Sequence, residues 1–501
     1  APPGNGRDLK ANYPDRVTLV ELDGAGHAAL VEHPTRIADE TVTFLRQHPV
    51  RVTAPAQNPR DRHIVGLEAF TSRTVVTNLD NPWDMAWGPD GQLWITERTA
   101  FRVTRLDPAT GTKRVALVLD DVYQSVVQDG LLGIALHPDL LRGRGRDWVF
   151  VSYTYDRDPG PDVERRIRVR RYTYNNASQA LHAPVDIIDN VPAHNDHGAG
   201  RLAVGPDGQL YFSRGDLGSN FLANYCNPIR SQDLPDAEAV RARDWSTYQG
   251  KILRLGLDGS IPDDNPMFAG VRSHIYAIGL RNTQGMVFGP GGLLYASDHG
   301  PSTDDELNLI VAGKNYGWPR VAGYRDDRAY VYANWSQSTP TPCRSLKFDG
   351  IRAPASVPQS KESEWNDPAF TPPLTTFFTV AADYDFATLG TATIAPAGID
   401  VYTAAAIPNW ANSILITGMR GGGLYRVKLG PDGRTVVGEP VEYFRNANRY
   451  RDVVVSPNGQ RIYLSTDSFG TTADAAGVRT SRLGHPGAVL EFTYTGPTPS
   501  R

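Results

Sequence analysis

Short apolar strands separated by turns that contain glycine and proline form the main pattern of this chain from about residue 68 onward. The repeated unit is an apolar strand, a turn of the Pro-Asp-Gly type, and a second strand rich in aromatic and β-branched residues. Clear copies are Met85–Ile95, Leu202–Phe212 and Met286–Tyr295, and weaker copies are Ile134–Val151, Ile414–Val427 and Val453–Leu464. Turns of this kind join antiparallel strands into hairpins.

Six copies at uneven spacing predict six blades of a β-propeller, with long insertions that form loops on one rim. About four strands per blade fit into residues 68–496 and leave room for those loops. An array of β-sandwiches is the structural alternative. The expected fold class is all-β, a six-bladed β-propeller, preceded by a short α/β segment.

The first 50 residues have a different pattern. Arg16–Leu22 predicts a strand, Gly24–Ala28 predicts a turn, and Pro34–Arg46 predicts an amphipathic helix. This order resembles the C-terminal end of an α/β-hydrolase, in which His27 would match the triad histidine. The chain has no Gly-x-Ser-x-Gly motif, so a working hydrolase is not expected.

We therefore expect three parts in this chain. Residues 1–50 are a hydrolase-like fragment, residues 51–67 are a linker with two prolines and several charges, and residues 68–496 are the propeller.

Composition narrows the classes of function. A formal net charge of -4 gives no basic surface for nucleic acid and no polybasic membrane patch. No run of about 18 apolar residues occurs, so no integral membrane segment is expected. The start Ala1-Pro2-Pro3-Gly4 is compatible with a removed leader, and a periplasmic or secreted location is the expectation. The two cysteines, Cys226 and Cys343, either pair in an oxidising compartment or remain as separate thiols.

His197 stands in Asn195-Asp196-His197-Gly198, just before an apolar strand, so it is expected on a loop at the entrance of a blade. A loop histidine is most often a solvated or capping residue. Such a residue becomes a general base when an acceptor holds its second ring nitrogen, because imidazole titrates near neutral pH. Asp196 is the adjacent carboxylate, although consecutive strand residues point to opposite faces.

An acidic turn follows the segment Arg281–Gly285. Asp304, Asp305 and Glu306 are consecutive carboxylates, and the simplest interpretation is a solvated loop. The alternative is calcium, because hard cations collect carboxylate and carbonyl oxygens, and Gly300-Pro301 can present carbonyls. Further oxygens downstream belong to Tyr316, Asp326 and Glu362.

Two arginines, Arg449 and Arg451, share one face of a predicted strand because strand side chains alternate. Paired guanidinium groups suit a ligand that carries several carboxylates. Salt bridges on the surface are the alternative.

Residues 68–496 resemble the soluble pyrroloquinoline quinone (PQQ) glucose and aldose-sugar dehydrogenases, in which these groups occur in the same order. The resemblance rests on a dense series of motifs. They are Asp-His-x-x-Gly-Arg-Leu from Asp196, Gly-Lys-Ile-Leu-Arg-Leu from Gly250, Arg-Asn-x-Gln-Gly from Arg281, Asp-Asp-Glu-Leu-Asn-Leu-Ile from Asp304, Asn-Tyr-Gly-Trp-Pro from Asn315, Lys-Glu-Ser-Glu-Trp from Lys361 and Asn-Arg-Tyr-Arg-Asp-Val from Asn448.

The resemblance implies an activity and its residues. His197 would take the proton from the anomeric hydroxyl of an aldose while hydride passes to the quinone, which gives a lactone. The implied catalytic residues are His197, Arg281 and Asp196, and the implied sugar-binding residues are these three together with Gln128. The implied PQQ ligands are Arg281, Asn282, Gln284, His299, Thr393, Arg420, Arg449, Arg451 and Asp467.

The resemblance also implies calcium. The carbonyl groups of Gly300 and Pro301 would bind the Ca²⁺ that polarises the quinone. Residues that match a second, structural pair of calcium ions, near the dimer contact of the glucose enzyme, are Glu306, Tyr316, Ala322, Tyr324, Asp326 and Glu362. The expected partners are an aldose, an external electron acceptor and a second copy of the chain in a homodimer.

Several positions depart from the family pattern. Arg420 replaces a lysine on the cofactor side, His299 replaces a glutamine there, and Phe221 replaces a glutamine on the sugar side. The loop with two aromatics that stack on glucose is shortened, and its nearest positions are Thr388 and Thr391. Candidates for a replacement aromatic are Trp335 and Phe386. A broad preference among aldoses is therefore expected.

Two other functions stay open at this point. One is a calcium-dependent lactonase on the same type of propeller, which needs a calcium ion held at the axis by carboxylates. The other is a non-enzymatic propeller that binds a partner.

Overall fold

The computed structural model describes residues 34–47, 59, 64–125, 128–158, 160–350, 352–474 and 477–497. The chain divides into two compact units, residues 1–57 and 58–501. In the first unit, α3 (Pro34–Gln47) confirms the predicted helix and ends one residue later. The predicted strand, the predicted turn and His27 lie outside the described residues, so the resemblance to a hydrolase stays a prediction.

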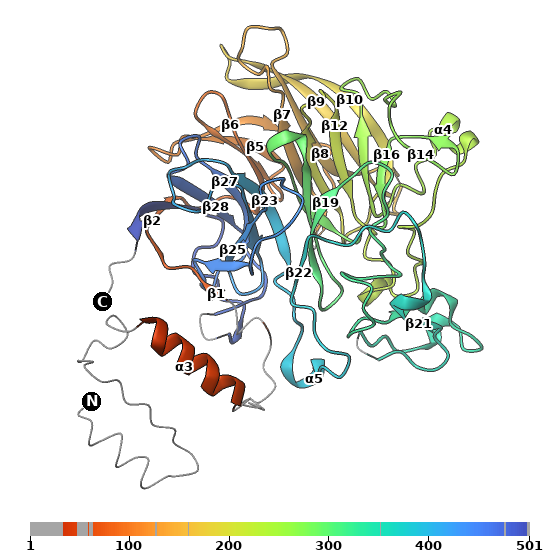
Figure 1. The fold of residues 1–501 in the computed structure, drawn as a ribbon. Coiled ribbons are helices and arrows are strands. Elements are labelled where there is room, and N and C mark those ends of the chain that lie inside the picture. Colours follow the sequence, from red (N-terminus) through yellow and green to blue (C-terminus); the bar gives the residue numbers. More distant parts are fainter. Residues whose placement is uncertain are drawn as a thin grey trace. The chain divides into compact units, whose positions relative to one another are not determined.

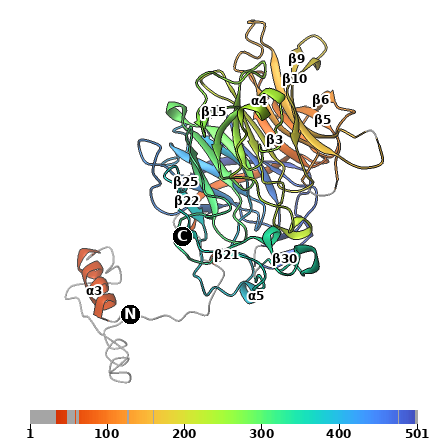
Figure 2. The same cartoon turned by 90° about the vertical axis from the view of Figure 1, so that its right-hand side faces the viewer.

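The second unit is a six-bladed β-propeller, as the hairpin repeats predicted (Figures 1 and 2). Each blade is an antiparallel sheet of four strands. In the first five blades these strands follow the sequence order from the axis outward, and in the last blade the outermost strand comes from the N-terminal side of the propeller. The first three blades are β3 (Pro82–Trp87), β4 (Leu93–Glu97), β5 (Arg102–Leu106) and β6 (Lys113–Val118); β7 (Leu131–Leu136), β8 (Trp148–Asp156), β9 (Arg165–Asn175) and β10 (Ala180–Pro192); and β11 (Ala199–Val204), β12 (Leu210–Arg214), β13 (Lys251–Leu255) and β16 (Ile275–Ile278).

The remaining three blades close the ring. They are β17 (Thr283–Phe288), β18 (Leu294–Asp298), β19 (Asp305–Ile310) and β22 (Thr375–Phe377); β23 (Pro396–Tyr402), β24 (Ser413–Gly418), β25 (Leu424–Lys428) and β26 (Val441–Tyr443); and β27 (Tyr450–Val455), β28 (Arg461–Thr466), β31 (Val489–Pro497) and β2 (Glu68–Val76). The N-terminal β2 pairs with the C-terminal β31, which joins the two ends of the propeller in one sheet. A short strand from the predicted linker, β1 (Ile64–Val65), adds to the edge of β26 in parallel.

The Pro-Asp-Gly turns make the hairpins for a local reason. Gly91 and Gly208 have φ of +73° and +74°, the left-handed region that a residue without a Cβ adopts easily. The preceding aspartate also fastens the turn, because Asp90 Oδ1 accepts the backbone N–H of Gln92. Five of the six predicted hairpins are the two innermost strands of a blade. The copy at Ile414–Val427 is instead the second and third strands, β24 and β25, because the inner turn of that blade has no Pro-Asp-Gly sequence.

The innermost strands surround a central channel. At one end they line a cavity of about 400 Å³. Beside it the buried Arg201 pairs with Asp84 and, at 3.1 Å, with Asp452. Arg201 Nε also donates to the carbonyl of Gln284 at 2.9 Å. The axis is therefore filled by a buried ion cluster that joins three blades.

Insertions between strands form the remaining elements. The hairpins are β14 (Met267–Phe268) with β15 (Val271–Arg272), β20 (Tyr332–Ala333) with β21 (Gln359–Ser360), and β29 (Thr472–Ala473) with β30 (Arg479–Thr480). The short helices are α4 (Ala237–Ala242), α5 (Phe386–Leu389) and the 3-10 turns η2 (Leu222–Asn224), η3 (Pro290–Gly292), η4 (Trp335–Gln337), η5 (Cys343–Ser345) and η6 (Glu362–Glu364). In both views β21 and α5 lie on the same side of the blades (Figures 1 and 2).

The fold answers one question that the sequence left open. Cys226 and Cys343 form a disulfide across 117 residues of sequence, so they pair. Among the described residues, no helix is both long enough and apolar enough to cross a membrane.

Candidate active site

The predicted site residues gather because of the direction of the innermost strands. Gln128 precedes β7, His197 precedes β11, Asn282 precedes β17, Thr393 precedes β23 and Arg449 precedes β27. All innermost strands run in the same direction along the channel, so their starts meet at one end of the propeller. Residues far apart in the sequence therefore line one site, as loops on a propeller rim do.

The loop that carries His197 is held from behind. His197 and Ala199 have φ of +46° and +47°, a region that L-residues occupy only when their surroundings impose it. The fully buried Arg214 donates to the carbonyl groups of Gly198 at 2.5 Å and Pro192 at 2.8 Å. Burial lowers the pKa of Arg214 to about 9. This arginine was not found from the sequence, and it fixes the two ends of the histidine loop.

The acceptor for the His197 ring is Asp216. Its Oδ1 lies 2.6 Å from His197 Nδ1, and its Oδ2 accepts Trp318 Nε1 at 2.8 Å. The backbone N–H of Gly218 also donates to Oδ1 at 2.9 Å. All of Asp216 is buried. The carboxylate is therefore fixed in place, and it sets which nitrogen of His197 faces outward.

Asp196 has a different role from the one that its position beside His197 suggested. Its Oδ1 accepts the backbone N–H of His197 at 2.9 Å and Gln128 Nε2 at 2.6 Å. Gln128 Oε1 in turn accepts from Asn282 Nδ2 at 3.3 Å and Gln284 Nε2 at 3.1 Å. The structure thus joins five of the predicted residues in one network around the amide of Gln128.

Arg281 lies between two aromatic rings. Its guanidinium is 5.4 Å from the ring of Phe221 and 5.2 Å from the ring of Trp318. Its Nη1 donates to the carbonyl of Gly300 at 3.1 Å. His299 Nε2 is 2.6 Å from the carbonyl of Pro396, and burial, followed by the nearby charge of Arg281, lowers the pKa of His299 well below its usual value. The neutral ring of His299 therefore donates to that carbonyl.

An excess of positive charge borders the same rim. Arg451 and Arg449 both pair with Asp467, at 2.8 Å and 2.9 Å, and Arg451 Nη1 donates to Gln284 Oε1 at 2.6 Å. Burial opposes the charge of Asp467, but Arg451, Arg449 and Arg98 hold its pKa at about 2. Burial lowers the pKa of Arg98 to about 10. Asp467 thus pairs with two guanidinium groups and lies near a third, a cluster that suits an anionic ligand.

The other predicted cofactor residues lie close by. Thr393 Oγ1 donates to Asp305 Oδ2 at 2.5 Å. Arg420 Nη1 donates a hydrogen bond to the hydroxyl of Thr391, so Arg420 lies next to one of the two threonines of the shortened loop.

Two of the three predicted acidic ligands, Glu306 and Glu362, are buried beside the loop at residues 322–327, whereas Asp326 is exposed. Glu306 Oε1 accepts the N–H of Gly323 at 2.7 Å, and Glu362 Oε1 accepts the N–H of Ala322 at 3.0 Å. Glu362 Oε2 accepts the N–H groups of residues 326 and 327. Burial raises the pKa of Glu362 to about 7 and that of Glu306 well above its usual value.

Not every predicted ligand presents its side chain to this group. The hydroxyl of Tyr316 donates to the carbonyl of Leu309 at 2.5 Å, and Tyr324 is partly exposed. Within the described ranges, no three or more His, Cys, Asp or Glu side chains are arranged to hold a metal ion.

A cavity of about 520 Å³ opens beside Arg281 and Phe221. Its lining includes Arg281 and Pro301, together with the aromatic side chains of Phe221, Trp335, Phe348 and Phe386. Both residues expected as replacement aromatics therefore border this cavity. Phe348 was missed in the sequence because its position depends on a disulfide that sequence spacing does not place.

Comparisons with known proteins agree with this arrangement. The chain matches the family described as Glucose / Sorbosone dehydrogenase over residues 79–344 and 382–473. Quinoprotein glucose dehydrogenase B of Acinetobacter calcoaceticus is 41% identical over 440 residues, which cover 85% of this chain and 91% of that protein.

Solved structures give the same result. The PQQ-bound form of aldose sugar dehydrogenase from Streptomyces coelicolor has a TM-score of 0.57 at 26% identity and covers 85% of this chain and 99% of that chain. The putative oxidoreductase (glucose dehydrogenase) of Thermus thermophilus has a TM-score of 0.58 at 27% identity and covers 85% of this chain and 100% of that chain.

Fold, site and likeness together define a β-propeller dehydrogenase. The chain belongs to the glucose/sorbosone dehydrogenase family and is an enzyme, as its motif series predicted.

Proposed function

We propose that this enzyme oxidises the anomeric hydroxyl of aldoses to lactones, with PQQ as cofactor, calcium as metal and His197 as general base. The observation that carries the proposal is the His197–Asp216 pair beside an arginine cluster, with the ring of His197 stacked on Phe221, which lines an aromatic cavity. A family of sugar dehydrogenases and a relative solved in its PQQ-bound form support it.

The residues present fit PQQ, a flat tricarboxylate. The guanidinium groups of Arg449 and Arg451 share the carboxylate of Asp467, so ligand carboxylates would balance the excess charge. Asn282 Oδ1 and Arg281 Nε are buried and have no hydrogen-bond partner among the described residues. Buried polar atoms normally have partners, so these two atoms favour a ligand that bonds them. When bound there, PQQ would supply the acceptor for the hydride from the anomeric carbon.

The donor set also fits calcium. Carbonyl and carboxylate oxygens are the ligands that Ca²⁺ prefers. Glu306 and Glu362 are buried carboxylates beside the loop at residues 322–327, and among the described residues their hydrogen-bond partners are backbone N–H groups and the amide of Asn308. Gly300 and Pro301 would hold the ion next to the quinone, where calcium would act as a Lewis acid.

His197 is placed to move a proton. Because Asp216 Oδ1 accepts from Nδ1, Nε2 keeps its lone pair and can take the proton of the anomeric hydroxyl. Asp216 then stabilises the imidazolium, since its second oxygen remains fixed by Trp318. Arg281 and Gln128 are positioned to orient the reacting end of the sugar, and Phe221 shields it from water.

The lactonase alternative is disfavoured by the axis of the propeller. Such an enzyme needs a cation held there by carboxylates. Here the guanidinium of Arg201 occupies that position between Asp84 and Asp452.

Reconstitution with PQQ and calcium tests the function. Adding an aldose without an electron acceptor should change the absorbance of the bound quinone as it is reduced, and a lactonase or a partner-binding propeller would show no such change. His197→Ala should bind PQQ like the wild type and lower turnover by about two to four orders of magnitude, as loss of a general base does. A wild-type spectrum that no aldose alters would refute the proposal.

The setting of the enzyme follows from the disulfide. Disulfides persist in oxidising compartments, so we infer that the enzyme works in the periplasm or outside the cell. It would pass electrons to an external acceptor. A homodimer remains part of the proposal, and its test is the mass in solution with and without calcium.

A further inference from the structure

The outer part of the aromatic cavity is built by two segments that are far apart in the sequence. One is the loop after β12 that carries Phe221 and Tyr225, and the other is the long insertion between β19 and β22 that carries Trp335 and Phe348. We call these four side chains the aromatic wall. Three of them, all but Tyr225, line the cavity.

The rings of the aromatic wall contact one another in a chain. Phe348 lies 6.1 Å from Phe221 with nearly perpendicular planes, 5.5 Å from Tyr225 and 5.2 Å from Trp335, measured between ring centroids. Tyr225 and Trp335 are 5.7 Å apart, also nearly perpendicular. Phe348 is the member of the wall that contacts all three others, and it is only partly buried.

One end of the wall lies at the reacting groups. The ring of Phe221 is stacked 5.8 Å from the ring of His197, and the guanidinium of Arg281 is 5.4 Å from it. Phe221 therefore stands between His197 and Phe348. A sugar whose anomeric hydroxyl faces His197 would reach Phe348 only with the part that is remote from the anomeric carbon.

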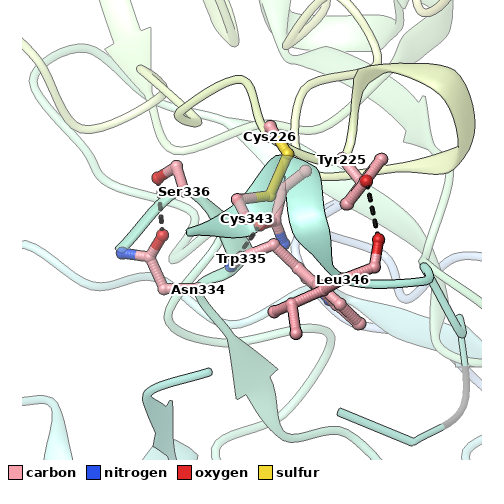
Figure 3. The surroundings of a disulfide bond; sticks show 8 residues. Tyr225, Cys226, Asn334, Trp335, Ser336, Cys343 and Leu346 are labelled. Atoms are coloured by element: carbon pink, nitrogen blue, oxygen red, sulfur yellow. Dashed lines mark hydrogen bonds between the residues drawn. A yellow bond between two sulfur atoms is a disulfide. The ribbon is translucent and has the colours of Figure 1, made fainter. Parts of the chain in front are cut away.

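The Cys226–Cys343 disulfide fastens the two segments together (Figure 3). Cys226 follows Tyr225 directly, and Tyr225 Oη donates to the carbonyl of Leu346 at 2.8 Å, as Figure 3 also shows. Cys343 is packed against Trp335 in a small hydrophobic cluster of its own. The cross-link thus acts on the residues that border Phe348 from both sides.

Hydrogen bonds make a second connection nearer to the active site. Asn220 Nδ2 donates to the carbonyl of Ala333 at 2.8 Å, and Asn220 Oδ1 accepts the N–H of Trp335 at 2.9 Å. These bonds fix the two segments to each other next to Phe221, at the inner end of the aromatic wall. The outer end, at Phe348, depends on the disulfide and on the Tyr225 bond.

We propose that Phe348 is a specificity-determining residue for the remote part of the sugar, and that the Cys226–Cys343 disulfide is the positioning element that holds it against Phe221. An aromatic ring offers its face to the C–H groups of a pyranose. A wall that is held in place before binding loses less entropy when the sugar arrives. The inference deepens the proposed aldose oxidation and rests on it.

The expected effects separate affinity from chemistry. Phe348→Ala raises KM for maltose about tenfold and KM for glucose less, as loss of one anchoring aromatic does, with kcat within about twofold of the wild type. Phe348→Tyr keeps the ring and restores KM. The Cys226→Ser/Cys343→Ser double variant raises KM for both sugars about three- to tenfold through lost preorganisation. Met267→Ala, at an exposed residue of β14 outside the cavity, is the matched control and leaves both constants unchanged.

A second measurement needs no turnover. Titration of the protein without cofactor by maltose should change the fluorescence of the tryptophans at the cavity, Trp318 and Trp335, and Phe348→Ala should shift the midpoint to higher sugar concentration. Thermal melts and thiol titration establish that each variant is folded and that the cysteine state is as designed. If the double serine variant does not fold, Phe348→Ala decides, because it leaves the disulfide intact.

The outcomes distinguish this inference from the proposed function. If the wild type oxidises aldoses and the folded variants keep wild-type KM and fluorescence midpoints, the role of Phe348 and the disulfide is refuted alone. If the reconstituted wild type oxidises no aldose, the proposed function fails, and a maltose midpoint unchanged in Phe348→Ala would then refute this inference as well.

Discussion

Nδ1 of His197 lies 2.6 Å from Oδ1 of Asp216, although 18 residues separate the two along the chain and only one of them belongs to the motif that indicated the site. The carboxylate does two things at once. It accepts the ring N–H, which selects the tautomer of His197, and it is itself held by Trp318 Nε1 at 2.8 Å. This arrangement has the logic of a general base oriented by a buried carboxylate.

Replacing Asp216 should therefore damage catalysis more than cofactor binding. In Asp216→Asn the amide can present its NH₂ to Nδ1, which favours the wrong tautomer, so turnover should fall by about two to four orders of magnitude. Binding of PQQ, followed by its absorbance, should stay close to that of the wild type. Asp432→Asn, in an exposed turn of the fifth blade, is the control. An Asp216→Asn enzyme with full turnover would show that another group orients His197.

The sequence predicted the blades because their turns carry strong local signals. A glycine at positive φ occurs in most inner hairpins, and in two of them an aspartate, Asp90 or Asp207, also accepts a backbone N–H of the turn. Both features depend on neighbouring residues only. The inner turn of the fifth blade has no Pro-Asp-Gly sequence. The copy of the repeat in that blade, Ile414–Val427, is therefore the hairpin of its second and third strands. Asp216 was missed because the hairpin register shifts between Ala199 and Leu202, which the sequence does not show. Only after this shift, where Ala199 pairs with Arg214, does His197 come opposite Asp216.

Other parts of the site depend on tertiary packing, which no local pattern encodes. Arg214 sits in an inner strand as though it were a core residue, and only the fold shows that it holds the carbonyl of Gly198. Phe348 is held at the cavity beside Cys343, whose disulfide partner, Cys226, lies 117 positions earlier in the sequence. Spacing in the sequence left open whether those cysteines pair at all.

Removal of calcium should lower stability and activity together. Glu306 and Glu362 are buried carboxylates with raised pKa values, so the folded state keeps two acidic groups close to one loop without an opposite charge from a described side chain in hydrogen-bonding contact. A bound cation would stabilise the folded state by about 2.7 kcal/mol at a free concentration of a hundred times its Kd. The melting temperature should fall on chelation and return when calcium is added back.

Glu362→Gln should reduce the response of melting temperature to calcium, whereas Glu364→Gln, next to it but exposed, should not. An enzyme that keeps its activity and its melting temperature after exhaustive chelation would argue against both calcium sites.

Acid should destabilise the propeller through Asp467. Arg451 and Arg449 hold its pKa at about 2 against the effect of burial, while the ordinary value is 3.8. The folded-state pKa is depressed, so the stabilisation is present above pH 3.8 and is lost as pH falls toward 2, because the unfolded state binds the proton first. The difference amounts to roughly 2 kcal/mol.

The measurement is the free energy of unfolding of the wild type and of Asp467→Asn between pH 6 and pH 2.5. The variant cannot titrate at this position, so the gap between the two proteins should narrow as the pH falls. A gap that stays constant over this range would mean that Asp467 does not titrate as its arginine partners require.

The propeller should function without the first unit. Residues 1–57 form a separate compact unit, and every site residue lies after residue 80. A chain that begins at residue 58 keeps β1 and β2, and β2 closes the ring by pairing with β31. We expect this shortened protein to bind PQQ and oxidise aldoses with unchanged kcat. A shortened chain that melts at a much lower temperature would show that the first unit stabilises the propeller.

Substrate breadth follows from the balance between the two ends of the cavity. At the reacting end, His197, Gln128 and Arg281 are fixed by buried hydrogen bonds, so any aldose with its anomeric hydroxyl there meets the same groups. Toward the remote end the cavity is lined by phenylalanines, while the polar side chains there, Asp349, Arg352 and Gln359, are exposed to solvent. Thr391 already bonds Arg420. Apolar rings tolerate changes in hydroxyl configuration, whereas a buried polar group left without its partner rejects the wrong sugar strongly.

We therefore expect glucose, galactose, xylose and maltose to be oxidised with similar kcat/KM, and steady-state rates with PQQ and calcium present check this. A preference for glucose above about a hundredfold, which equals roughly 2.7 kcal/mol, would mean that the remote end still builds a selective polar pocket.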